Sequence, residues 1–539
     1  MIHEPPRPLA PLAHAGRLRT LVALATLALP VATSALLVVA GVLAAPALAA
    51  QQRTRDTRNP DFATFDRYVA QAAHDWHVPG LAIAVVKDDS LVFAKGYGVI
   101  EIGKPAPVTP DTRFAIGSTT KAMTVAALAM LVDEGKLHWD DRVIDHLPNF
   151  RLYDPYVTRE LTIRDLLTHR TGLPGTDLLW IFNSYPAPEV IRRLRYVKPE
   201  SSFRSRWDYQ NIMFAVAGAI VEQASGMPWA DFVRRRIFAP LGMTETAPTV
   251  AAITGQPNVA VPHAEVDDTV RVVPVRTTDP IAPAGSVWSS VRDMSRWMRF
   301  MLDSGRVGTT RLIAPETFRE IVAPEMRVPL DMYPALSLSR PRVFMYALGW
   351  FVQDYHGQIV WMHTGSIDGM SALIALLPEQ RAGVYVLANL DHAELRHALM
   401  YRVLDLYEGN APRDWSSELH TLYSTLDHEE REAERKRASQ RVAGTHPSLP
   451  LERYAGTYVD STYGTVVVTA GGDALHFSFA GGAAKPLEHW DYDTFRERPD
   501  TPVDRDRFVT FAPDGAGQVR ALRVFGVTFT RAASDSPGS

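Results

Sequence analysis

The sequence contains no cysteine, and only eight of its 539 residues are lysine. The absence of cysteine excludes disulfide bridges, thiolate metal sites and a cysteine nucleophile. Two motifs of other hydrolase classes are also missing. Without Gly-x-Ser-x-Gly an α/β-hydrolase is disfavoured, and without His-Glu-x-x-His a zinc-dependent hydrolase is disfavoured. A net charge of −4 gives no indication of nucleic-acid binding.

The composition is that of a globular protein with more than one domain. Apolar residues make up 46% of the chain and charged residues 22%, which are ordinary proportions. A chain of 539 residues is too long for a single compact core, so we expect two or three domains.

The N-terminal segment has the pattern of an export signal. It carries arginines but no lysine, and Leu21–Ala50 is almost wholly apolar and ends in the small-x-small sequence Ala-Leu-Ala. We expect a signal peptide over residues 1–49 and a polar linker over 50–60, which makes the protein periplasmic or secreted and leaves it without stable membrane insertion. The alternative is an uncleaved membrane anchor over residues 21–45, because the apolar run is long enough to span a bilayer.

Residues 61–408 have strand patterns at both ends and a mostly helical stretch over 185–305. This order predicts an α/β (α+β) domain in which an antiparallel sheet is flanked by helices and interrupted by an inserted helical region. A cleft between sheet and helices is a usual place for a small-molecule site. The expected strands are Leu81–Lys87, Leu91–Tyr97, Tyr346–Gln353, Gln358–His363, Ser371–Leu377 and Gly383–Asn389.

The C-terminal part of the chain has a different pattern. Residues 409–447 are highly charged and predict a solvated linker helix. Residues 448–531 contain short alternating strands separated by turn residues, which predicts a separate small all-β sandwich or barrel. Residues 532–539 are expected to form a disordered tail. The strands expected in the β domain are Gly456–Val459, Gly464–Ala470, Ala474–Phe479, Arg507–Ala512 and Arg520–Thr530.

A serine and a lysine stand three residues apart at the start of an apolar helical segment. The segment is Phe114–Val132, and Ser118 and Lys121 lie on one face of the expected helix. Because the helix is apolar nearly all round, it should be buried, and desolvation would lower the pKa of the lysine toward neutrality. A neutral amine beside a hydroxyl is a general base beside a nucleophile. Alternatively, Ser118 only opens the helix and Lys121 reaches water. Of the eight lysines, Lys121 alone follows a serine at this spacing.

Two further short motifs follow in the chain. Tyr209 and Asn211 form the only Tyr-x-Asn sequence. His363-Thr364-Gly365 follows an apolar strand and precedes a serine, and outside the predicted signal it is the only His-x-Gly sequence. Taken singly, these residues would be ordinary helix-start and strand-end residues.

The order Ser-x-x-Lys, Tyr-x-Asn, His-Thr-Gly resembles that of the penicillin-recognising serine hydrolases. This family includes class C β-lactamases, DD-peptidases, D-aminopeptidases and related carboxylesterases, and its class A members carry Ser-x-x-Lys, Ser-Asp-Asn and Lys-Thr-Gly. The present chain has tyrosine in the second motif, as class C enzymes do, and histidine where lysine is usual in the third. The resemblance covers about 62–408, and several related enzymes also carry a C-terminal β domain. Segments that look like family landmarks are Leu161–Pro174, Pro240–Met243, Ala282–Gly285 and Leu348–Trp350.

The resemblance implies roles for the nucleophile and its bases. Ser118 would attack a carbonyl carbon and become acylated. Lys121 would take the serine proton, together with Tyr209 if nearby cations lower the pKa of the phenol; otherwise Tyr209 is an acid that protonates the leaving group. The sequence leaves the choice between the two bases open. Asn211 would hold Lys121 and the substrate amide through hydrogen bonds.

The resemblance also implies an oxyanion site. Its two donors would be the backbone N–H groups of Ser118 and Ser366, and the adjoining Thr364 and Gly365 would bind substrate. His363 would orient Tyr209 or the substrate. An unperturbed histidine is mostly neutral at pH 7.5, whereas the usual lysine is a cation that attracts the carboxylate of a β-lactam.

We therefore expect an exported serine hydrolase that cleaves a small ester, amide or short peptide through an acyl-enzyme, without a metal or other cofactor. Three alternatives stay open: a D-amino-acid-specific or cell-wall peptidase, a weak β-lactamase, and a slow-turnover sensor that binds its ligand as an acyl group. The oligomeric state is not indicated by the sequence.

Overall fold

The computed structural model describes residues 60–533 apart from a few internal positions (184, 410–412, 500 and 502–503). The predicted signal over 1–49, nearly all of the linker over 50–60 and most of the C-terminal tail lie outside the described residues. Within the described part of the chain, no helix is both long and apolar enough to cross a membrane.

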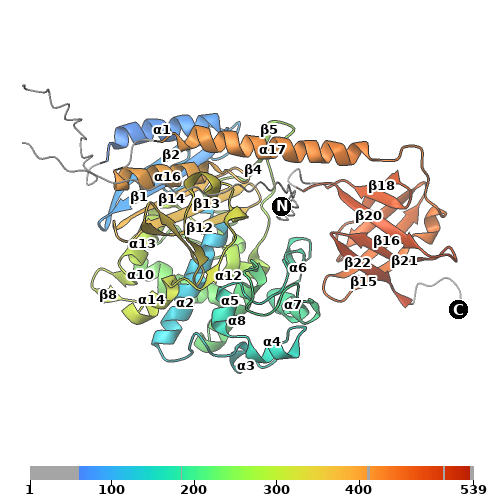
Figure 1. Cartoon of the computed structure of the whole chain (residues 1–539), viewed down its shortest axis with the longest axis horizontal. Helices are drawn as coiled ribbons and strands as arrows, with labels where there is room; N and C mark the ends of the chain where they lie inside the picture. The colour runs from blue at the N-terminus through green and yellow to red at the C-terminus, as the bar shows by residue number, and fades with distance from the viewer. Residues whose placement is uncertain (1–59, 184, 410–412, 500, 502–503, 534–539) are drawn as a thin grey trace, which may run out of the picture. The chain divides into compact units, whose positions relative to one another are not determined.

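The first domain is built on an eight-stranded antiparallel sheet with the strand order β2-β1-β14-β13-β12-β11-β10-β9 (Figure 1). Strand β1 pairs with β14, so the first and last strands of the domain are neighbours, and the helical region is inserted between them. This arrangement confirms the expected fold class. The strands are β1 Gly80–Lys87, β2 Ser90–Gly98, β9 Met326–Arg327, β10 Phe344–Tyr346, β11 Phe351–Tyr355, β12 Gln358–Ile367, β13 Met370–Leu377 and β14 Ala382–Ala388.

Helices cover both faces of the sheet, and alternation along β1 divides the core in two. Leu81, Ile83 and Val85 belong to the core shared with α1 and α16, whereas the intervening residues pack toward α2, α8 and α13. A strand buried on both faces is apolar throughout, which is why β1 has no polar alternation. The helices are α1 Phe62–Asp75, α2 Lys121–Asp133, α8 Asn211–Ser225, α13 Val291–Leu302 and α16 Leu395–Glu408.

Shorter elements complete this domain. The helices are α3 Val143–His146, α4 Pro155–Glu160, α5 Ile163–Leu167, α6 Leu178–Ile181, α7 Ala187–Arg193, α9 Trp229–Val233, α10 Ala239–Leu241, α11 Val250–Ile253, α12 Ala282–Gly285, α14 Pro315–Val322 and α15 Leu336–Ser339. The remaining strands are β3 Phe114–Ala115, β4 His263–Val266, β5 Thr269–Val272, β6 Trp288–Ser289, β7 Arg306–Val307 and β8 Thr310–Arg311.

The structure differs from the sequence-based expectations at three places in this domain. The single strand expected over Tyr346–Gln353 is two antiparallel strands, because Gly349 has φ of 71° and turns the chain between β10 and β11. The segment Leu161–Pro174, whose closing glycine and proline predict a helix that ends there, contains only the short α5, which opens with a Thr162–Asp165 capping box. The inserted region also contains the hairpin of β4 and β5, which we did not predict.

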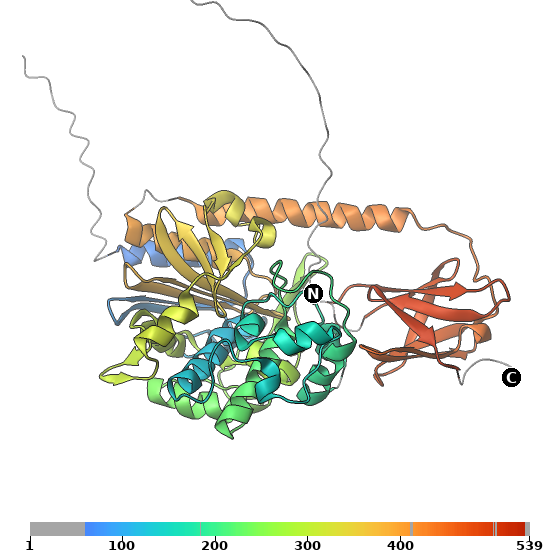
Figure 2. The same cartoon turned by 60° about the horizontal axis from the view of Figure 1, so that its bottom comes forward.

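The charged linker is a single helix, α17 Trp415–Ser439, which runs without a break (Figure 2). Its first turns bury Trp415 and Leu419 against α16, and its highly charged second half is exposed. The linker helix predicted over 409–447 is therefore observed over Trp415–Ser439, and it begins with a short docked segment.

The C-terminal domain is a closed antiparallel barrel, which confirms a separate all-β domain. Aromatic side chains such as Tyr454, Tyr458 and Phe511 fill its interior. Two of its strands were not expected, and the long strand expected over Arg520–Thr530 is divided by a tight turn at Phe525 and Gly526, where both φ angles are positive. The barrel strands are β15 Gly456–Asp460, β16 Gly464–Gly471, β17 Ala474–Phe479, β18 Lys485–Asp491, β19 Thr494–Glu497, β20 Arg507–Pro513, β21 Val519–Val524 and β22 Val527–Arg531.

Candidate active site

The predicted nucleophile lies on a tight turn at the start of α2. A 3₁₀ turn over Gly117–Thr120 leads directly into the helix. Ser118 therefore lies just before the helix, and Lys121 is the first helical residue. Gly117 has φ of 51°, and a Cβ atom there would lie 2.7 Å from the backbone nitrogen of Ser366. Only glycine meets both conditions at this position.

The end of β12 approaches the same turn from the other side. A Cβ atom on Gly365 would lie 2.0 Å from the carbonyl oxygen of Ile116 and 3.2 Å from the backbone nitrogen of Ser118. The two glycines thus allow the strand and the turn to come together. Their contact brings the Ser118 and Ser366 amides into one place, the arrangement that an oxyanion site requires.

Replacing Gly365 with alanine should separate these two segments. The new methyl group would overlap the Ile116 carbonyl, so β12 or the serine turn must shift by about 1 Å. We expect Gly365→Ala to slow acylation of Ser118 by about 100-fold, as loss of one oxyanion donor does. The measurement is the rate of covalent labelling by a fluorophosphonate. Gly515→Ala is the control, because that glycine lies in an exposed turn without a positive φ, and an added Cβ there touches nothing. Unchanged labelling of Gly365→Ala would contradict an oxyanion site here.

Lys121 is fully buried and contacts the nucleophile directly. Its Nζ donates to Ser118 Oγ at 3.0 Å, to Asn211 Oδ1 at 2.8 Å and to the carbonyl oxygen of Ala284 at 3.0 Å. Burial lowers the pKa of Lys121 to about 7, and the negative charge of Asp177 offsets part of this effect. Both the amine and the ammonium are therefore populated near neutral pH.

Tyr209 presents its ring to the same amine. Lys121 Nζ lies 4.7 Å from the centroid of the Tyr209 ring. Burial raises the pKa of the Tyr209 hydroxyl well above 10, and the neighbouring Ser118 hydroxyl offsets only part of the shift. The phenol therefore keeps its proton at neutral pH. Of the two bases that the sequence left open, Lys121 is the one that can be neutral and unprotonated in this environment.

Asn211 joins Lys121 to the half-buried carboxylate of Asp177. Its Nδ2 donates to Asp177 at 3.2 and 3.1 Å, and Trp180 Nε1 donates to the same carboxylate at 2.8 Å. Sequence reasoning missed Asp177, because it lies in a loop just before α6 and no short motif marks it. Trp180, interpreted from the sequence as a wall or core residue, is buried and also holds Asp177.

His363 belongs to a chain of three buried polar side chains. Its Nδ1 donates to the carbonyl oxygen of Thr364 at 2.6 Å, so its Nε2 accepts from the Tyr346 hydroxyl at 3.0 Å. Tyr346 in turn lies 3.2 Å from His169 Nε2, and His169 Nδ1 accepts from the backbone N–H of Gln210 at 3.0 Å. His169 Nε2 is therefore the donor to Tyr346. His169 is thus linked to His363 through Tyr346.

The same chain defines how His363 relates to Tyr209. The two rings are 6.3 Å apart, and both nitrogens of His363 bond to other groups, so His363 does not hydrogen-bond Tyr209. The His169 ring packs against Tyr209 at 4.4 Å instead. Burial lowers the pKa of His363 to about 3, and the charge of Lys121 lowers it further. His363 is therefore a neutral side chain over the whole physiological pH range.

A buried arginine supports the oxyanion strand from behind. Arg396 Nη1 donates to the carbonyl oxygen of Gly365 at 2.7 Å and to Ser366 Oγ at 2.9 Å, while its Nη2 pairs with Glu394 at 2.8 Å. Thr364 is held in a similar way by the Tyr333 hydroxyl at 2.8 Å. Because Glu394 balances the charge of Arg396, this arginine does not supply the cleft with the free cation that a lysine in the third motif would give.

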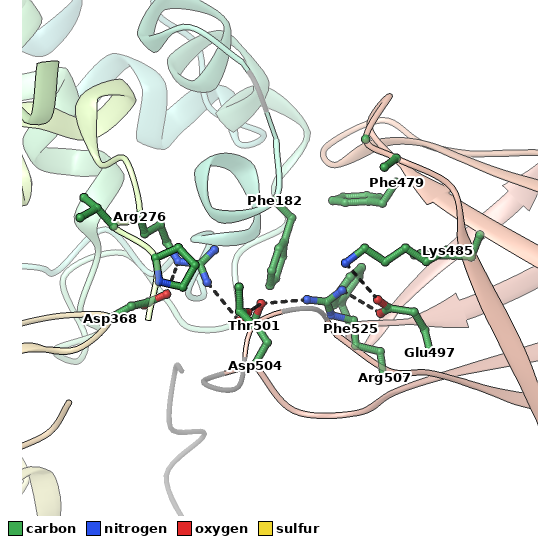
Figure 3. A pocket seen from close by; sticks show the side chains of 15 residues that line it. Phe182, Arg276, Asp368, Phe479, Lys485, Glu497, Thr501, Asp504, Arg507 and Phe525 are labelled. Atoms are coloured by element: carbon green, nitrogen blue, oxygen red, sulfur yellow. Dashed lines mark hydrogen bonds and ion pairs between the residues drawn. The ribbon is translucent and has the colours of Figure 1, made fainter. Parts of the chain in front are cut away.

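A cavity of about 290 Å³ lies where the barrel meets the first domain (Figure 3). Arg276 pairs there with Asp368 at 2.5 Å and with Asp504 of the barrel at 3.1 Å. Phe182 stacks on Phe525 of the barrel with ring centroids 5.3 Å apart. Asp368, to which the sequence assigned no role, thus links the residues after Ser366 to the barrel. Among the described residues there is no cluster of three or more side chains that could hold a metal ion.

The sequence profile of the Beta-lactamase family matches residues 65–408. The chain belongs to this family. Residues 440–536 match a second profile, which is described only as a domain of unknown function, so the Beta-lactamase domain is followed by a barrel without an assigned role. The family resemblance that the three motifs indicated is therefore confirmed.

Individual relatives support the same placement. An unguisins hydrolase of Aspergillus campestris is 31% identical over 441 residues, which is 76% of this chain and 78% of the relative. The octameric penicillin-binding protein homologue of Pyrococcus abyssi is similar in structure, with a TM-score of 0.58, 22% identity and coverage of 87% of this chain and 100% of the other. The D-amino acid amidase of Ochrobactrum anthropi has a TM-score of 0.54 and 22% identity, and covers 64% of this chain and 99% of its own. At these identities the two solved structures are similar in fold.

Proposed function

We propose that this Beta-lactamase-family chain is a serine hydrolase that cleaves uncharged esters or amides through an acyl-enzyme on Ser118. The observation that carries the proposal is the contact of 3.0 Å between Ser118 Oγ and the buried Nζ of Lys121, whose pKa burial lowers to about 7. An amine with that pKa is well matched to act as a general base at neutral pH.

Acylation would use the groups already in contact. Neutral Lys121 takes the Ser118 proton as Oγ attacks the carbonyl carbon, and the oxyanion receives the N–H groups of Ser118 and Ser366. When the tetrahedral intermediate collapses, the C–O or C–N bond breaks and the leaving group takes a proton from Tyr209, which Lys121 then replaces. In deacylation neutral Lys121 takes a proton from the water that attacks the acyl carbon, the bond from that carbon to Ser118 Oγ breaks, and the ammonium returns the proton to Oγ.

The charges around the nucleophile favour an uncharged acyl group. His363 is neutral, Arg396 is paired with Glu394, and Lys121 is protonated only in part at neutral pH. Thr364 and Gly365, which the sequence assigns to substrate binding, bring no charge to the site. A carboxylate on the substrate would thus gain hydrogen bonds without a strong ion pair.

The test of the proposed function uses the purified chain with three substrates: p-nitrophenyl butyrate, D-alanyl-p-nitroanilide and nitrocefin. We expect stoichiometric labelling of Ser118 by a fluorophosphonate and turnover of the ester or the amide. Preference for the D-alanyl amide would identify a D-amino-acid-specific peptidase. Labelling without turnover of any substrate would favour the slow acyl-binding sensor, and labelling at another residue would overturn the proposal.

His363→Lys should change the preference between substrates. A lysine at this position would place a cation beside the acyl site, so the ratio of nitrocefin to p-nitrophenyl butyrate turnover should rise by about tenfold, even if both rates fall. For the wild type, the low pKa of His363 means that its charge stays constant between pH 6 and 8. The charge of His363 should therefore add no pH dependence to the substrate ratio of the wild type over that range. His356→Lys, at an exposed turn, is the control. Efficient nitrocefin hydrolysis by the wild type would contradict this prediction.

We also propose that the chain is exported and that residues 1–49 are removed. The support is the apolar run over Leu21–Ala50 and its small-residue end. N-terminal sequencing of the protein from the extracytoplasmic fraction should give a start at Ala50. A full-length protein that stays with the membrane fraction would instead support the anchor.

A further inference from the structure

The half-buried carboxylate of Asp177 lies beside the candidate site and accepts hydrogen bonds from two neutral donors. Trp180 Nε1 donates to its Oδ1, and Asn211 Nδ2 bridges both of its oxygens. Burial raises the pKa of Asp177, whereas these two donors and the charge of Lys121 act in the opposite direction and favour the ionised form. Asp177 lies in the loop before α6, and Asn211 is the first residue of α8. Asn211 connects this carboxylate to Lys121, because its amide hydrogen-bonds both side chains.

The first effect concerns the orientation of the Asn211 amide. An ionised carboxylate only accepts hydrogen bonds, so it must face the NH₂ end of the amide. The Oδ1 end then faces Lys121 Nζ, as the distance of 2.8 Å shows. If the amide rotated by 180°, two N–H donors would point at the amine, and a protonated Lys121 could not accept them. Asp177 thus decides which end of Asn211 faces the base.

The second effect concerns charge. During acylation Lys121 becomes an ammonium inside a buried site, where an isolated cation is unfavourable. The other titratable side chains that face it are Tyr209, which is protonated, and His169 and His363, which are neutral because burial lowers their pKa values. The charge that acts to stabilise the ammonium is that of Asp177.

We propose that Asp177 is a positioning residue of this hydrolase: through Asn211 it turns an acceptor oxygen toward Lys121, and its negative charge stabilises the protonated amine that forms during acylation. The inference rests on the proposed function, because it assumes that Lys121 takes the proton of Ser118. In this arrangement the Asp177 carboxylate acts on the base, Lys121, through the side-chain amide of Asn211.

The test is the pH dependence of Ser118 labelling by a fluorophosphonate in Asp177→Asn. Only neutral Lys121 accepts the serine proton, so the labelling rate of the wild type should rise with pH and level off above about pH 7. Removing the charge lowers the pKa of Lys121, and the rising limb should move to lower pH by roughly one unit. The plateau should fall about tenfold or more, because the amide that replaces the carboxylate can rotate and release the Asn211 amide.

Two variants separate this role from a structural one. Asp208→Asn removes a nearby carboxylate that pairs with Arg206. This variant should leave the rising limb of the labelling rate at its wild-type pH. Asp177→Glu keeps the charge, so it should lower the plateau while the limb stays near its wild-type position. A loss of folded protein alone would lower the plateau without moving the limb. An unmoved limb in Asp177→Asn overturns the inference, and if that variant does not fold, a shifted limb in Asp177→Glu overturns it.

The same experiment distinguishes the inference from the proposed function. If wild-type Ser118 is not labelled at any pH, the proposed function fails. If the wild type is labelled with the expected rising limb and Asp177→Asn has the same limb, the proposed function stands and the role of Asp177 is wrong.

Discussion

Ser118→Ala is expected to lower hydrolysis of every active substrate by about 10⁴-fold or more and to abolish covalent labelling. The variant removes the only atom that can form the acyl bond in the proposed mechanism. Its fold should be intact, because alanine is small and the tight contacts of the turn involve the neighbouring Gly117 and Gly365. The measurements are steady-state kinetics with p-nitrophenyl butyrate and the melting temperature of the same samples.

The control for this variant is Ser202→Ala, which removes the hydroxyl of an exposed serine. It should keep wild-type rates and labelling. Near wild-type turnover by Ser118→Ala, with a normal melting temperature, would show that another residue is the nucleophile.

Lys121→Met is expected to lose activity and gain stability together. Methionine fills the buried space without an amine, so the general base is lost and kcat/KM should fall by at least about 10³-fold. The stability gain follows from the lowered pKa, since the folded state takes up the lysine proton less readily than the unfolded state. A pKa of about 7 against 10.5 corresponds to on the order of 5 kcal/mol of unfavourable free energy at and below neutral pH.

The sign of the pH dependence gives a second measurement. Between about pH 7 and 10.5 the unfolded chain holds a proton on Lys121 that the folded chain does not, so the free energy of unfolding of the wild type should rise with pH across that window. Below pH 7 both states are protonated, and the difference between the wild type and Lys121→Met should be constant. Lys136→Met, an exposed lysine, should leave the stability and its pH dependence unchanged. A less stable Lys121→Met with the same pH dependence as the wild type would contradict the lowered pKa.

Much of the fold could be predicted from local pattern, because the strands at the ends of the first domain are apolar runs of ordinary length. The hairpin of β1 and β2 and the strands β12 to β14 lie where their apolar residues indicated. The errors fall where one residue changes the backbone direction. Gly349 divides one expected strand, and the turn at Phe525 divides another, although neither breaks the apolar pattern. The strands β18 and β19 were missed because they contain charged and polar residues that pair only within the closed barrel.

Only the residues of the candidate site that belong to short motifs could be predicted from the sequence. Ser118, Lys121, Tyr209 and Asn211 come together as their spacing and order indicated, with Lys121 at the centre. Their supporting residues are distant in sequence and have no motif: Asp177, Tyr346 and Arg396. Such residues are found by the buried hydrogen bonds they make, which depend on tertiary packing.

The chain of hydrogen bonds from His169 through Tyr346 to His363 has an evolutionary consequence. Every member has a fixed direction of donation, because Gln210 donates at one end and the Thr364 carbonyl accepts at the other. A lysine at position 363 could only donate, so Tyr346 would have to reverse its bond and His169 would lose its acceptor for the Gln210 amide. The histidine and lysine forms of the third motif therefore require opposite directions of hydrogen-bond donation in this network. A change from one form to the other therefore needs at least two substitutions, because lysine at position 363 alone leaves a buried donor without an acceptor.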